Sequence, residues 1–427
     1  MKKFVQSLLA RKARSVIRRF HPSVVIITGS VGKTSTRAAI AAVLSTKFRV
    51  RTNAENYNNE FGVPLTILGE PSPGRSALGW LRIFLKPVKD YPNMLVLEYG
   101  ADQPGDLEYL CDIAAPDVAV LTAVSPVHAE HFKDIDELAQ EKATVLRRCN
   151  PEGLCILNKD DERVMALKAE AAAPVQTYGF DQTADTHAEG VEQHIREDNS
   201  FEPREVFSTL SFDLVYGQTR IAADIPNRLG RPPISAALAA AAVGEHFGVA
   251  PEQMVKQFAD IPMIPGRMNP IGGIKGSLLL DDSYNAAPAS VSSALDVLAG
   301  FRPFEGSRRI AALGPMAELG AYSEEEHRKI GEKAARLGID ILVTVGPETA
   351  MTEFAAKEAG MKEEQTAHFG NAKEAGRWLD HEVKKGDIVL IKGSQSARME
   401  KVVRELMAEP LRAPDLLVRQ YGKWLDN

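Results

Sequence analysis

One short segment, residues 28–35, constrains the fold of this chain more than any other. It reads TGSVGKTS and lies between an apolar β-branched run, SVVII, and a segment with helical character, RAAIAAVLS. Glycines let backbone N–H groups approach phosphate oxygens, and the amino end of a following helix adds positive potential. The segment therefore predicts a nucleotide-phosphate site in which Lys33 reaches the β/γ-phosphates and the Thr34 hydroxyl binds Mg²⁺. The expected nucleotide contacts are Gly29, Ser30, Val31, Gly32, Lys33, Thr34 and Ser35.

After this loop the chain alternates between short apolar runs and helical segments. Two of the runs, NMLVLEYG and DVAVLTAV, are continuous and apolar, as buried parallel strands are. The stretch FSTLSFDLVYGQTRIAADI alternates in polarity instead, which predicts two antiparallel strands joined at Tyr216-Gly217. The first half is therefore predicted to be an α/β, P-loop NTPase-like domain whose sheet is mostly parallel.

A second α/β unit begins near Pro265-Gly266-Arg267. Four apolar runs there, SLLLDDSYN, RRIAALGPM, DILVTVGPE and DIVLIKGSQ, are each followed by a helical segment. This order predicts a Rossmann-like C-terminal domain. We therefore expect three parts: a basic amphipathic helix over residues 1–20, a central ATP-binding domain over 21–263 and a C-terminal domain over 264–427.

The predicted N-terminal helix carries many lysines and arginines but no acidic residue, and its apolar residues fall near one face. Two uses fit this pattern. Either the apolar stripe packs on the next domain, or the helix rests on an anionic membrane surface. No apolar run in the chain reaches membrane-spanning length. The net charge of −6 argues against a general nucleic-acid-binding surface.

Several separated segments occur in a characteristic order. Together with the short TGSxGKTS loop they resemble the Mur ligases, the ATP-dependent enzymes that build the peptide of bacterial cell walls, over residues 22–405. The segments of the second unit are most similar to the branch that adds D-alanyl-D-alanine to a UDP-linked muramoyl tripeptide. The segments are NAENYNNEFGVPLT, LEYGADQPGDLEYL, PVHAEHF with EKATVL, Gly266-Arg267, DDSYNAAPAS, LGPMAELG and KGSQSARME.

Besides Thr34, three residues are expected to serve the metal ions. Glu98 ends the strand NMLVLEYG, and a carboxylate in that position beside a phosphate-binding loop is placed to hold Mg²⁺. His128 and His131 form an HxxH pattern without an evident third zinc ligand, and the resemblance assigns only His128, to a second Mg²⁺. Lys142 has the pattern of a solvated helix lysine, but it matches the family lysine that is carbamylated, which requires a neutral amine.

The second unit is expected to complete the site. A fixed guanidinium stabilises phosphoryl charge, and the resemblance places Arg267 at the γ-phosphate. The matching DDSYN segment meets the nucleotide in relatives, which implies contacts from Asp281, Asp282, Tyr284 and Asn285. Asparagines beside glycine are often turn formers, which is the alternative for the three asparagines in the next set. The expected substrate-binding residues are Asn56, Asn58, Asn59, Lys392 and Ser394.

The resemblance implies an ADP-forming carboxylate–amine ligase that uses ATP, two Mg²⁺ ions and a carbamylated Lys142. It joins D-alanyl-D-alanine, or a similar amino acid or dipeptide, to a muramoyl-peptide-like carboxylate, in the cytoplasm or at the inner membrane surface. One alternative is a folylpolyglutamate or poly-γ-glutamate synthetase-like ligase. The other is a P-loop switch that binds a partner or a membrane through its basic helix. The expected catalytic residues are Lys33, His128, Lys142 and Arg267.

Relatives usually carry an N-terminal domain that grips UDP, whereas only residues 1–22 precede the first predicted strand here. The acceptor is therefore expected to be a small-molecule or lipid-linked cell-wall precursor, and a separate UDP-binding partner is a further expectation. Gly230-Arg231-Pro232-Pro233 also replaces the family's Gly-x-His-Asn segment, so a nucleotide contact there is expected to be lost or replaced.

Overall fold

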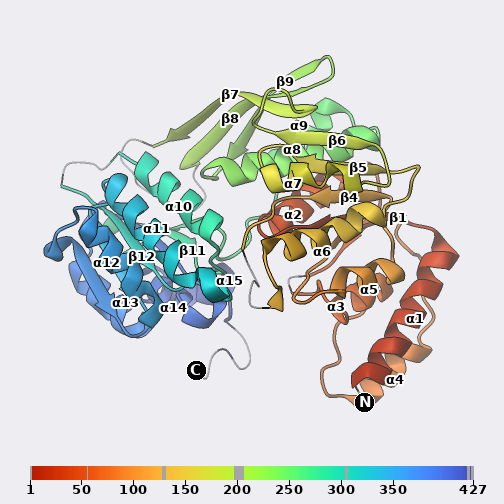
Figure 1. Cartoon of the computed structure of the whole chain (residues 1–427), viewed down its shortest axis with the longest axis horizontal. Coiled ribbons are helices and arrows are strands. Elements are labelled where there is room, and N and C mark those ends of the chain that lie inside the picture. Colours follow the sequence, from red (N-terminus) through yellow and green to blue (C-terminus); the bar gives the residue numbers. More distant parts are fainter. Residues whose placement is uncertain are drawn as a thin grey trace.

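The computed structural model describes residues 2–54, 56–126, 131–196, 206–302, 306–420 and 424. The chain forms two lobes side by side, each built on its own sheet (Figure 1). Among the helices in these ranges, none combines the length and apolar character that crossing a membrane requires.

The first sheet has nine strands in the order β2-β3-β1-β4-β5-β6-β7-β8-β9. Neighbouring strands are parallel as far as β7, and β8 and β9 are antiparallel additions. The predicted hairpin at Tyr216-Gly217 is confirmed, because β8 and β9 flank it. The strands are β1 (Ser23–Thr28), β2 (Val50–Thr52), β3 (Met94–Glu98), β4 (Val118–Leu121), β5 (Leu154–Asn158), β6 (Val175–Gly179), β7 (Thr186–Ile195), β8 (Ser208–Tyr216) and β9 (Thr219–Pro226).

Both faces of the parallel part of this sheet are buried, which explains why its strands are continuous apolar runs. Within β1, Val24 and Ile26 join one core cluster, with α1, α3, α5 and α6. Val25 and Ile27 join the other, with α2, α8 and α9. Burying one such side chain contributes about 1.5–3 kcal/mol. The helices are α1 (Lys2–Phe20), α2 (Lys33–Ser45), α3 (Gly62–Leu68), α4 (Ala77–Leu85), α5 (Asp106–Ile113), α6 (Ile135–Arg147), α7 (Glu162–Ala166), α8 (Arg231–His246) and α9 (Pro251–Ala259).

The second sheet has six strands in the order β10-β11-β15-β12-β13-β14. The four predicted strands are present and parallel, but the sequence prediction missed the two edge strands. The first missed strand, NPIG, contains proline and glycine, which are tolerated at a sheet edge. The strands are β10 (Asn269–Gly272), β11 (Leu278–Asp282), β12 (Arg309–Leu313), β13 (Ile341–Val345), β14 (Thr366–Phe369) and β15 (Ile388–Lys392).

Helices cover both faces of the second sheet. Leu280 and Leu390 pack into a cluster with α10 and α11. Leu279 and Val389 pack into a cluster on the other face with α13 and α14. The helices are α10 (Pro288–Gly300), α11 (Ser323–Arg336), α12 (Ala350–Glu358), α13 (Ala372–Glu382), α14 (Glu400–Leu406) and α15 (Ala413–Leu416).

The N-terminal helix α1 packs on the first lobe. Leu9 and Ala13 are fully buried and Val16 is 6% exposed, within the cluster that α3 and α5 complete. The structure therefore confirms the packing interpretation of the apolar stripe. This stripe is not available to a membrane, because protein already covers it.

The two lobes share a packed junction. Phe207, which precedes β8, stacks on Phe301 of the second lobe with 6.2 Å between ring centroids. Gly230 has a φ of 73°, and a Cβ there would lie 2.5 Å from Val297 Cγ2. Both contacts join the first lobe to α10 or to the residue after it. Gly230 is the N-cap of α8, so its close approach to Val297 places the start of α8 against α10.

Candidate active site

The backbone of the phosphate-binding loop requires glycine at two positions. Gly29 has a φ of 147°, and a Cβ there would lie 2.0 Å from Thr122 Oγ1. Gly32 is the N-cap of α2 with a φ of 82°, a conformation that side chains disfavour. The Thr122 hydroxyl also donates to the Val31 carbonyl oxygen at 2.6 Å. The loop is therefore held against the end of β4.

Two serines of the loop have different surroundings. The Ser30 hydroxyl donates to the Ser125 carbonyl oxygen at 2.9 Å and accepts from the Ser125 amide at 3.0 Å. This reciprocal pair ties the loop to the segment that follows β4. Ser35 lies in the first turn of α2, where the helix dipole favours negative charge.

Lys33 folds back over the loop. Its Nζ donates to the carbonyl oxygens of Gly29 at 2.7 Å and Ser30 at 3.2 Å. Burial lowers the pKa of Lys33, while the charge of Glu98 raises this pKa and the charge of Arg267 lowers it. A cation held here by neutral carbonyl groups is available to a polyanion, whose negative charge would stabilise it far better.

Thr34 and Glu98 form an oxygen-rich pair beside the loop. The Thr34 hydroxyl donates to Glu98 Oε2 at 2.9 Å, and Asn58 Nδ2 donates to Glu98 Oε1 at 3.2 Å. Arg37 lies 3.8 Å from the same carboxylate. Asn53 exchanges two hydrogen bonds with the Glu98 backbone, at 3.0 and 2.9 Å. Hydroxyl and carboxylate oxygens at one point are the ligand types that Mg²⁺ prefers.

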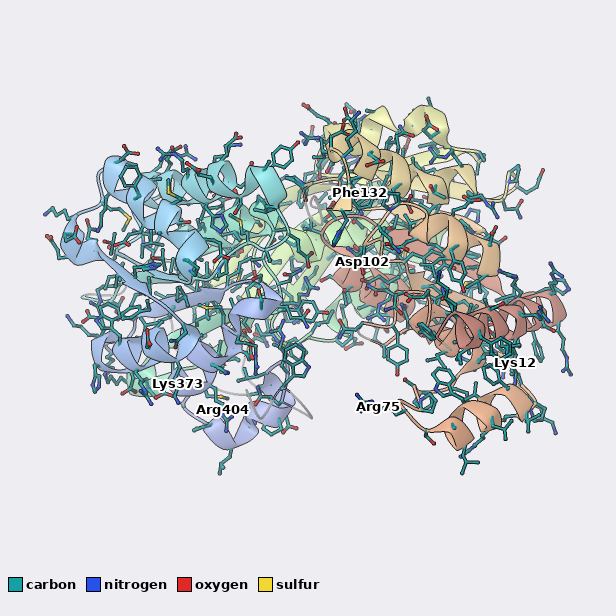
Figure 2. The ribbon with its side chains drawn as sticks, turned by 60° about the horizontal axis from the view of Figure 1, so that its bottom comes forward. Lys12, Arg75, Asp102, Phe132, Lys373 and Arg404 are labelled. Carbon is teal, nitrogen blue, oxygen red and sulfur yellow. The ribbon has the colours of Figure 1, made fainter. Side chains whose placement is uncertain are left out.

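Lys142 on α6 is 2% exposed, so it is not the solvated helix lysine that its local pattern alone suggests. Burial and the like charge of Lys33 lower the pKa of Lys142 to about 7, and the charges of Glu141 and Asp102 raise it. In Figure 2, Asp102 lies on the side of the first lobe that faces the second. At neutral pH a large fraction of this amine is uncharged and nucleophilic. His128, the other predicted metal ligand of this region, lies outside the described residues.

In the second lobe, a buried ion pair lies at the carboxyl end of the sheet. Lys392 is 2% exposed and its Nζ donates to Asp282 Oδ2 at 2.7 Å and to the Asn285 carbonyl oxygen at 2.9 Å. Burial lowers the pKa of Lys392, and the charge of Asp282 raises it. The neighbouring Asp281 is fully buried, and burial raises the pKa of this carboxyl group to about 6.

Arg267 and Tyr284 bring the second lobe to the first. The Arg267 guanidinium lies over the Tyr284 ring at 4.2 Å from its centroid, and its Nε is buried without a hydrogen-bond partner. The Tyr284 hydroxyl donates to Asn56 Oδ1 at 2.7 Å, across the two lobes. The predicted nucleotide contacts of the second lobe are thus next to the predicted acceptor segment of the first. Stacking holds the guanidinium in a fixed orientation, with donors left for an anion.

The remaining predicted residues have mainly local partners. Asn59 Oδ1 accepts from the Gly62 amide at 3.0 Å, a local contact of the kind that the turn-forming alternative predicts. The hydroxyl groups of Ser394 and Ser396 lie 3.1 Å apart. Asn285 Oδ1 accepts from the Ala286 amide at 2.9 Å. These side chains shape loops at the site through contacts close to them in the chain.

Two arginines that support the site from a distance were not predicted from the sequence. Arg419 donates to the carbonyl oxygens of Ser283 and Tyr284 and to Glu400 Oε2, with Glu400 itself 1% exposed. Nothing in the sequence links Arg419 to the DDSYN segment, because more than a hundred residues separate them. Arg37 had a signal, since it lies one helical turn after Lys33 on α2.

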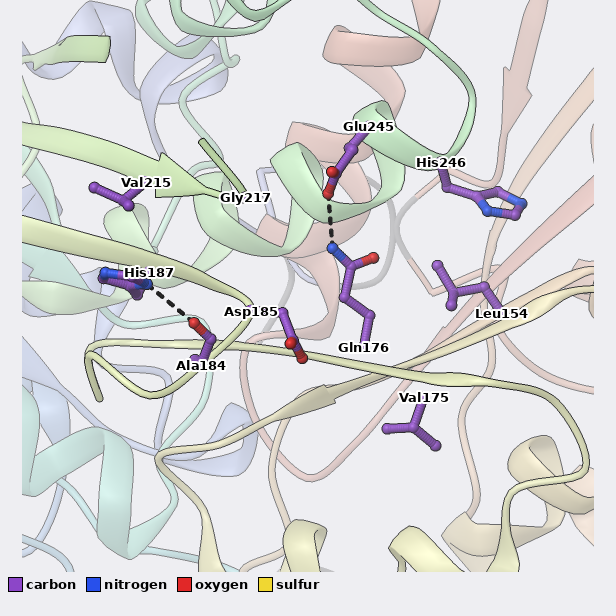
Figure 3. A pocket seen from close by; sticks show the side chains of 10 residues that line it. All are labelled: Leu154, Val175, Gln176, Ala184, Asp185, His187, Val215, Gly217, Glu245 and His246. Carbon is purple, nitrogen blue, oxygen red and sulfur yellow. Dashed lines mark hydrogen bonds between the residues drawn. The ribbon is translucent and has the colours of Figure 1, made fainter. Parts of the chain in front are cut away.

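A separate hollow lies at the amino ends of β5 and β6 (Figure 3). It measures about 650 Å³. Three of its polar side chains are already bonded to protein: Gln176 donates to Glu245 at 2.7 Å, and Asp185 accepts from Thr177 at 2.6 Å. Ligands of parallel sheets bind at the carboxyl ends of the strands. We therefore place the active site at the phosphate-binding loop.

A phosphate-binding loop at the carboxyl edge of a parallel sheet, faced by residues of a second α/β lobe, defines an enzyme of the P-loop class that acts with a nucleotide. Two family models match the chain: the Mur ligase middle domain over residues 27–244, and the glutamate ligase domain of Mur ligases over residues 266–395. The chain therefore belongs to the Mur ligase family, whose members are ADP-forming acid–amino-acid ligases.

Individual relatives point to one branch of this family. The UDP-N-acetylmuramoyl-tripeptide–D-alanyl-D-alanine ligase of Bacillus subtilis (strain 168) is 26% identical over 404 residues, which are 94% of this chain and 80% of that protein. The ligase of the same name from Mycobacterium tuberculosis (strain H37Rv) is 32% identical, over 91% of this chain and 73% of that protein.

Solved structures match the fold. A crystal structure of MurF from Acinetobacter baumannii has a TM-score of 0.78 at 23% identity, covering 92% of this chain and 79% of that one. The MurF ligase of Thermotoga maritima in complex with ADP has a TM-score of 0.75 at 24% identity, covering 94% and 83%. The predicted α/β architecture with two sheets is therefore confirmed.

Proposed function

We propose that this chain adds D-alanyl-D-alanine to the free carboxylate of a muramoyl tripeptide during peptidoglycan precursor synthesis. The observation that carries the proposal is the contact of Tyr284, on which Arg267 stacks, with Asn56 of the other lobe, in a chain of the Mur ligase family. The named activity of the relatives at 26% and 32% identity selects the substrates. No observation favours a nucleotide switch, for which a buried amine with a pKa of about 7 has no use.

The loop fits the triphosphate of ATP. Gly29 and Gly32 allow its positive-φ backbone and its close approach to Thr122, and Lys33 already lies over its carbonyl groups at 2.7 and 3.2 Å. Arg267, with its unsatisfied Nε, supplies a second fixed cation for the γ-phosphate. Under this proposal residues 29–35 hold the phosphates, and Asp281, Asp282, Tyr284 and Asn285 approach the rest of the nucleotide.

The oxygen ligands fit magnesium. Thr34 and Glu98, 2.9 Å apart, would hold one Mg²⁺, and His128 with Lys142 would hold a second. When bound, these ions neutralise phosphate charge. A neutral Lys142 amine can add CO₂ and lose a proton to give a carbamate anion, which a pKa of about 7 permits near neutral pH. The carbamate and the second metal are our proposals for this chain.

The reaction divides into two substitutions. An oxygen of the acceptor carboxylate attacks the γ-phosphorus of ATP, the bond to the β-phosphate oxygen breaks and ADP leaves. The amine nitrogen of D-alanyl-D-alanine then attacks the acyl carbon of the resulting acyl phosphate, loses a proton and expels phosphate. Lys33 and Arg267 stabilise the transferring phosphoryl charge, and contact between the lobes at Tyr284 and Asn56 helps to exclude water.

The acceptor and the amine would lie on opposite sides of this centre. Asn56 and Asn58 belong to the acceptor side, where Asn58 contacts the Glu98 carboxylate, and Lys392 and Ser394 belong to the amine side. An enzyme that consumes ATP is expected in the cytoplasm. A separate UDP-binding partner and contact with the inner membrane surface stay predictions.

The test is a phosphate-release assay with purified chain, ATP and Mg²⁺. We expect release only when both a muramoyl tripeptide acceptor and D-alanyl-D-alanine are present, with the new amide seen by mass spectrometry. Lys33→Ala should lose on the order of 10³-fold in rate, whereas the exposed Lys168→Ala should not change it. Phosphate release that is independent of both substrates would contradict the ligase assignment.

A further inference from the structure

Helix α4 is held to the first lobe by only one of its faces. Ile83 is buried, Trp80 stacks on Phe84 with 6.2 Å between ring centroids, and Trp80 also meets Phe61 edge-on at 6.3 Å. Lys12 of α1 donates to the carbonyl oxygens of Phe84 and Lys86 at the end of the helix, at 3.0 and 2.7 Å. These contacts fix the helix and its orientation.

The opposite face of α4 exposes leucines. Leu78, Leu81 and Leu85 are 79%, 53% and 74% exposed, and their spacing places all three on one side of the helix. Near the start of the neighbouring α1, Phe4 is 69% exposed. Single exposed leucines are ordinary on protein surfaces, but three on one ordered helix form a patch that needs an occupant.

The surroundings of this patch are basic. Residues 71–89 contain no aspartate or glutamate, and neither do residues 1–20 of the adjacent α1. Arg75, Arg82 and Lys89 are exposed in or beside α4, and Figure 2 shows Arg75 at one end of the helix and Lys12 near the other. The whole chain carries a net charge of −6, so this end of the molecule is positively charged whereas the rest is negatively charged overall. We call Leu78, Leu81, Leu85, Arg75, Arg82 and Lys89 the α4 patch.

We propose that the α4 patch docks this protein on the surface of an anionic lipid bilayer. Apolar residues on one helix face with a basic border are the pattern of helices that lie in the headgroup region. The border selects lipid over a second copy of the chain, because two such patches facing each other would bring like charges together. An anionic leaflet instead attracts each exposed lysine or arginine. This docking is independent of the ligase chemistry. It assigns the lipid contact to α4 in place of α1, because the apolar stripe of α1 is buried.

The experiment is co-sedimentation of the full chain with large vesicles, at low and high salt. One set contains phosphatidylglycerol in phosphatidylcholine, and the other contains phosphatidylcholine alone. We expect binding to the first set, loss of binding at high salt and little binding to the second. The triple variant Leu78→Ser, Leu81→Ser, Leu85→Ser should have a partition coefficient for the anionic vesicles at least about tenfold lower. The partition coefficient of the variant Arg75→Glu, Arg82→Glu, Lys89→Glu should fall by a similar factor.

Matched variants on the second lobe control for general surface effects. Leu411 and Phe354 are 97% and 51% exposed, so their replacement by serine tests exposed apolar area elsewhere. Lys373→Glu, Arg377→Glu and Arg404→Glu test charge reversal on exposed helix residues of that lobe, where Figure 2 labels Lys373 and Arg404. We expect these controls to keep the vesicle binding of the unchanged chain.

Four results would overturn the proposal. Three concern vesicles: no binding to anionic vesicles, equal binding to phosphatidylcholine vesicles, and unchanged binding of the leucine variant. The fourth is a dimer of the unchanged chain in sedimentation equilibrium, with the leucine variant monomeric. The last would assign the patch to a second copy. Ligase activity in vesicle-free solution is measured on the same samples, so failure of the lipid proposal is distinguishable from failure of the proposed function.

Discussion

Lys142 in the first lobe and Lys392 in the second are equally buried, at 2% exposure, but their surroundings differ. Lys392 has a carboxylate, Asp282, at 2.7 Å. The largest charge effect on Lys142 comes from another cation, Lys33, and its pKa falls to about 7. Burial alone thus does not decide what a lysine does. Burial lowers the pKa of both lysines, but the charge of Asp282 opposes this effect at Lys392, whereas the charge of Lys33 adds to it at Lys142.

The largest expected effect concerns the stability of the second lobe. Lys392→Met leaves the Asp282 carboxylate, whose side chain is only 13% exposed, without its cation, which should lower the free energy of unfolding by about 3–5 kcal/mol. Urea denaturation followed by circular dichroism measures this change. Adding Asp282→Asn should recover more than half of the loss. The exposed pair of Lys329 and Glu325 provides the control, because Lys329→Met should cost less than about 1 kcal/mol. A small loss for Lys392→Met would erase the contrast between the two lysines.

The second prediction concerns activity. Lys142→Ala should lower the ligation rate on the order of 100-fold, because it removes the anion proposed to hold a metal. The free energy of unfolding should change little or rise, since no ion pair is broken. Short carboxylates such as acetate or formate should restore part of the rate in this variant and none in Lys33→Ala. Full activity of Lys142→Ala in CO₂-depleted buffer would contradict the carbamate.

The third prediction uses pH. The pKa of Lys142 is about 7 in the folded chain, compared with 10.5 for an ordinary lysine. Between these values the unfolded chain binds a proton that the folded chain has released, so this residue makes the unfolding free energy increase as pH rises. Relative to Lys142→Met, the unchanged chain in CO₂-free buffer should gain about 2 kcal/mol between pH 7 and 9. Parallel stability curves for the two chains would show that the amine of Lys142 is charged throughout.

The smallest expected effect is at the contact between the lobes. Tyr284→Phe removes the hydrogen bond to Asn56, an exposed interaction worth about 0.5–1.5 kcal/mol at most. We expect KM for the acceptor to rise by a few-fold, with kcat nearly unchanged. Tyr322→Phe, on a tyrosine 37% exposed in the second lobe, is the control. A large fall in kcat for Tyr284→Phe would mean that the ring position of Arg267 depends on this hydroxyl.

Much of the fold could be predicted from short segments. The strand–loop–helix at residues 28–35, the hairpin at Tyr216-Gly217 and the four parallel strands of the second sheet each carry a local pattern in apolar or glycine residues. The edge strands β10 and β14 were missed, because four-residue strands carry too little periodicity. The supporting contacts of Arg419 were missed, since no local pattern encodes a contact between residues that are 136 positions apart in the chain.

The sequence by itself determined the chemistry that this chain can perform. The glycines of the loop, Lys33, Thr34 and the carboxylate that ends β3 have roles that follow from backbone freedom and charge within a few residues. Only the tertiary structure decided the burial of Lys142 and the exposure of Leu78, Leu81 and Leu85. From the helix sequence alone, Lys142 would be expected to be a solvated charge, and the three leucines would be expected to form a buried apolar stripe. Burial depends on which other segments cover a side chain, and those segments come from distant parts of the sequence.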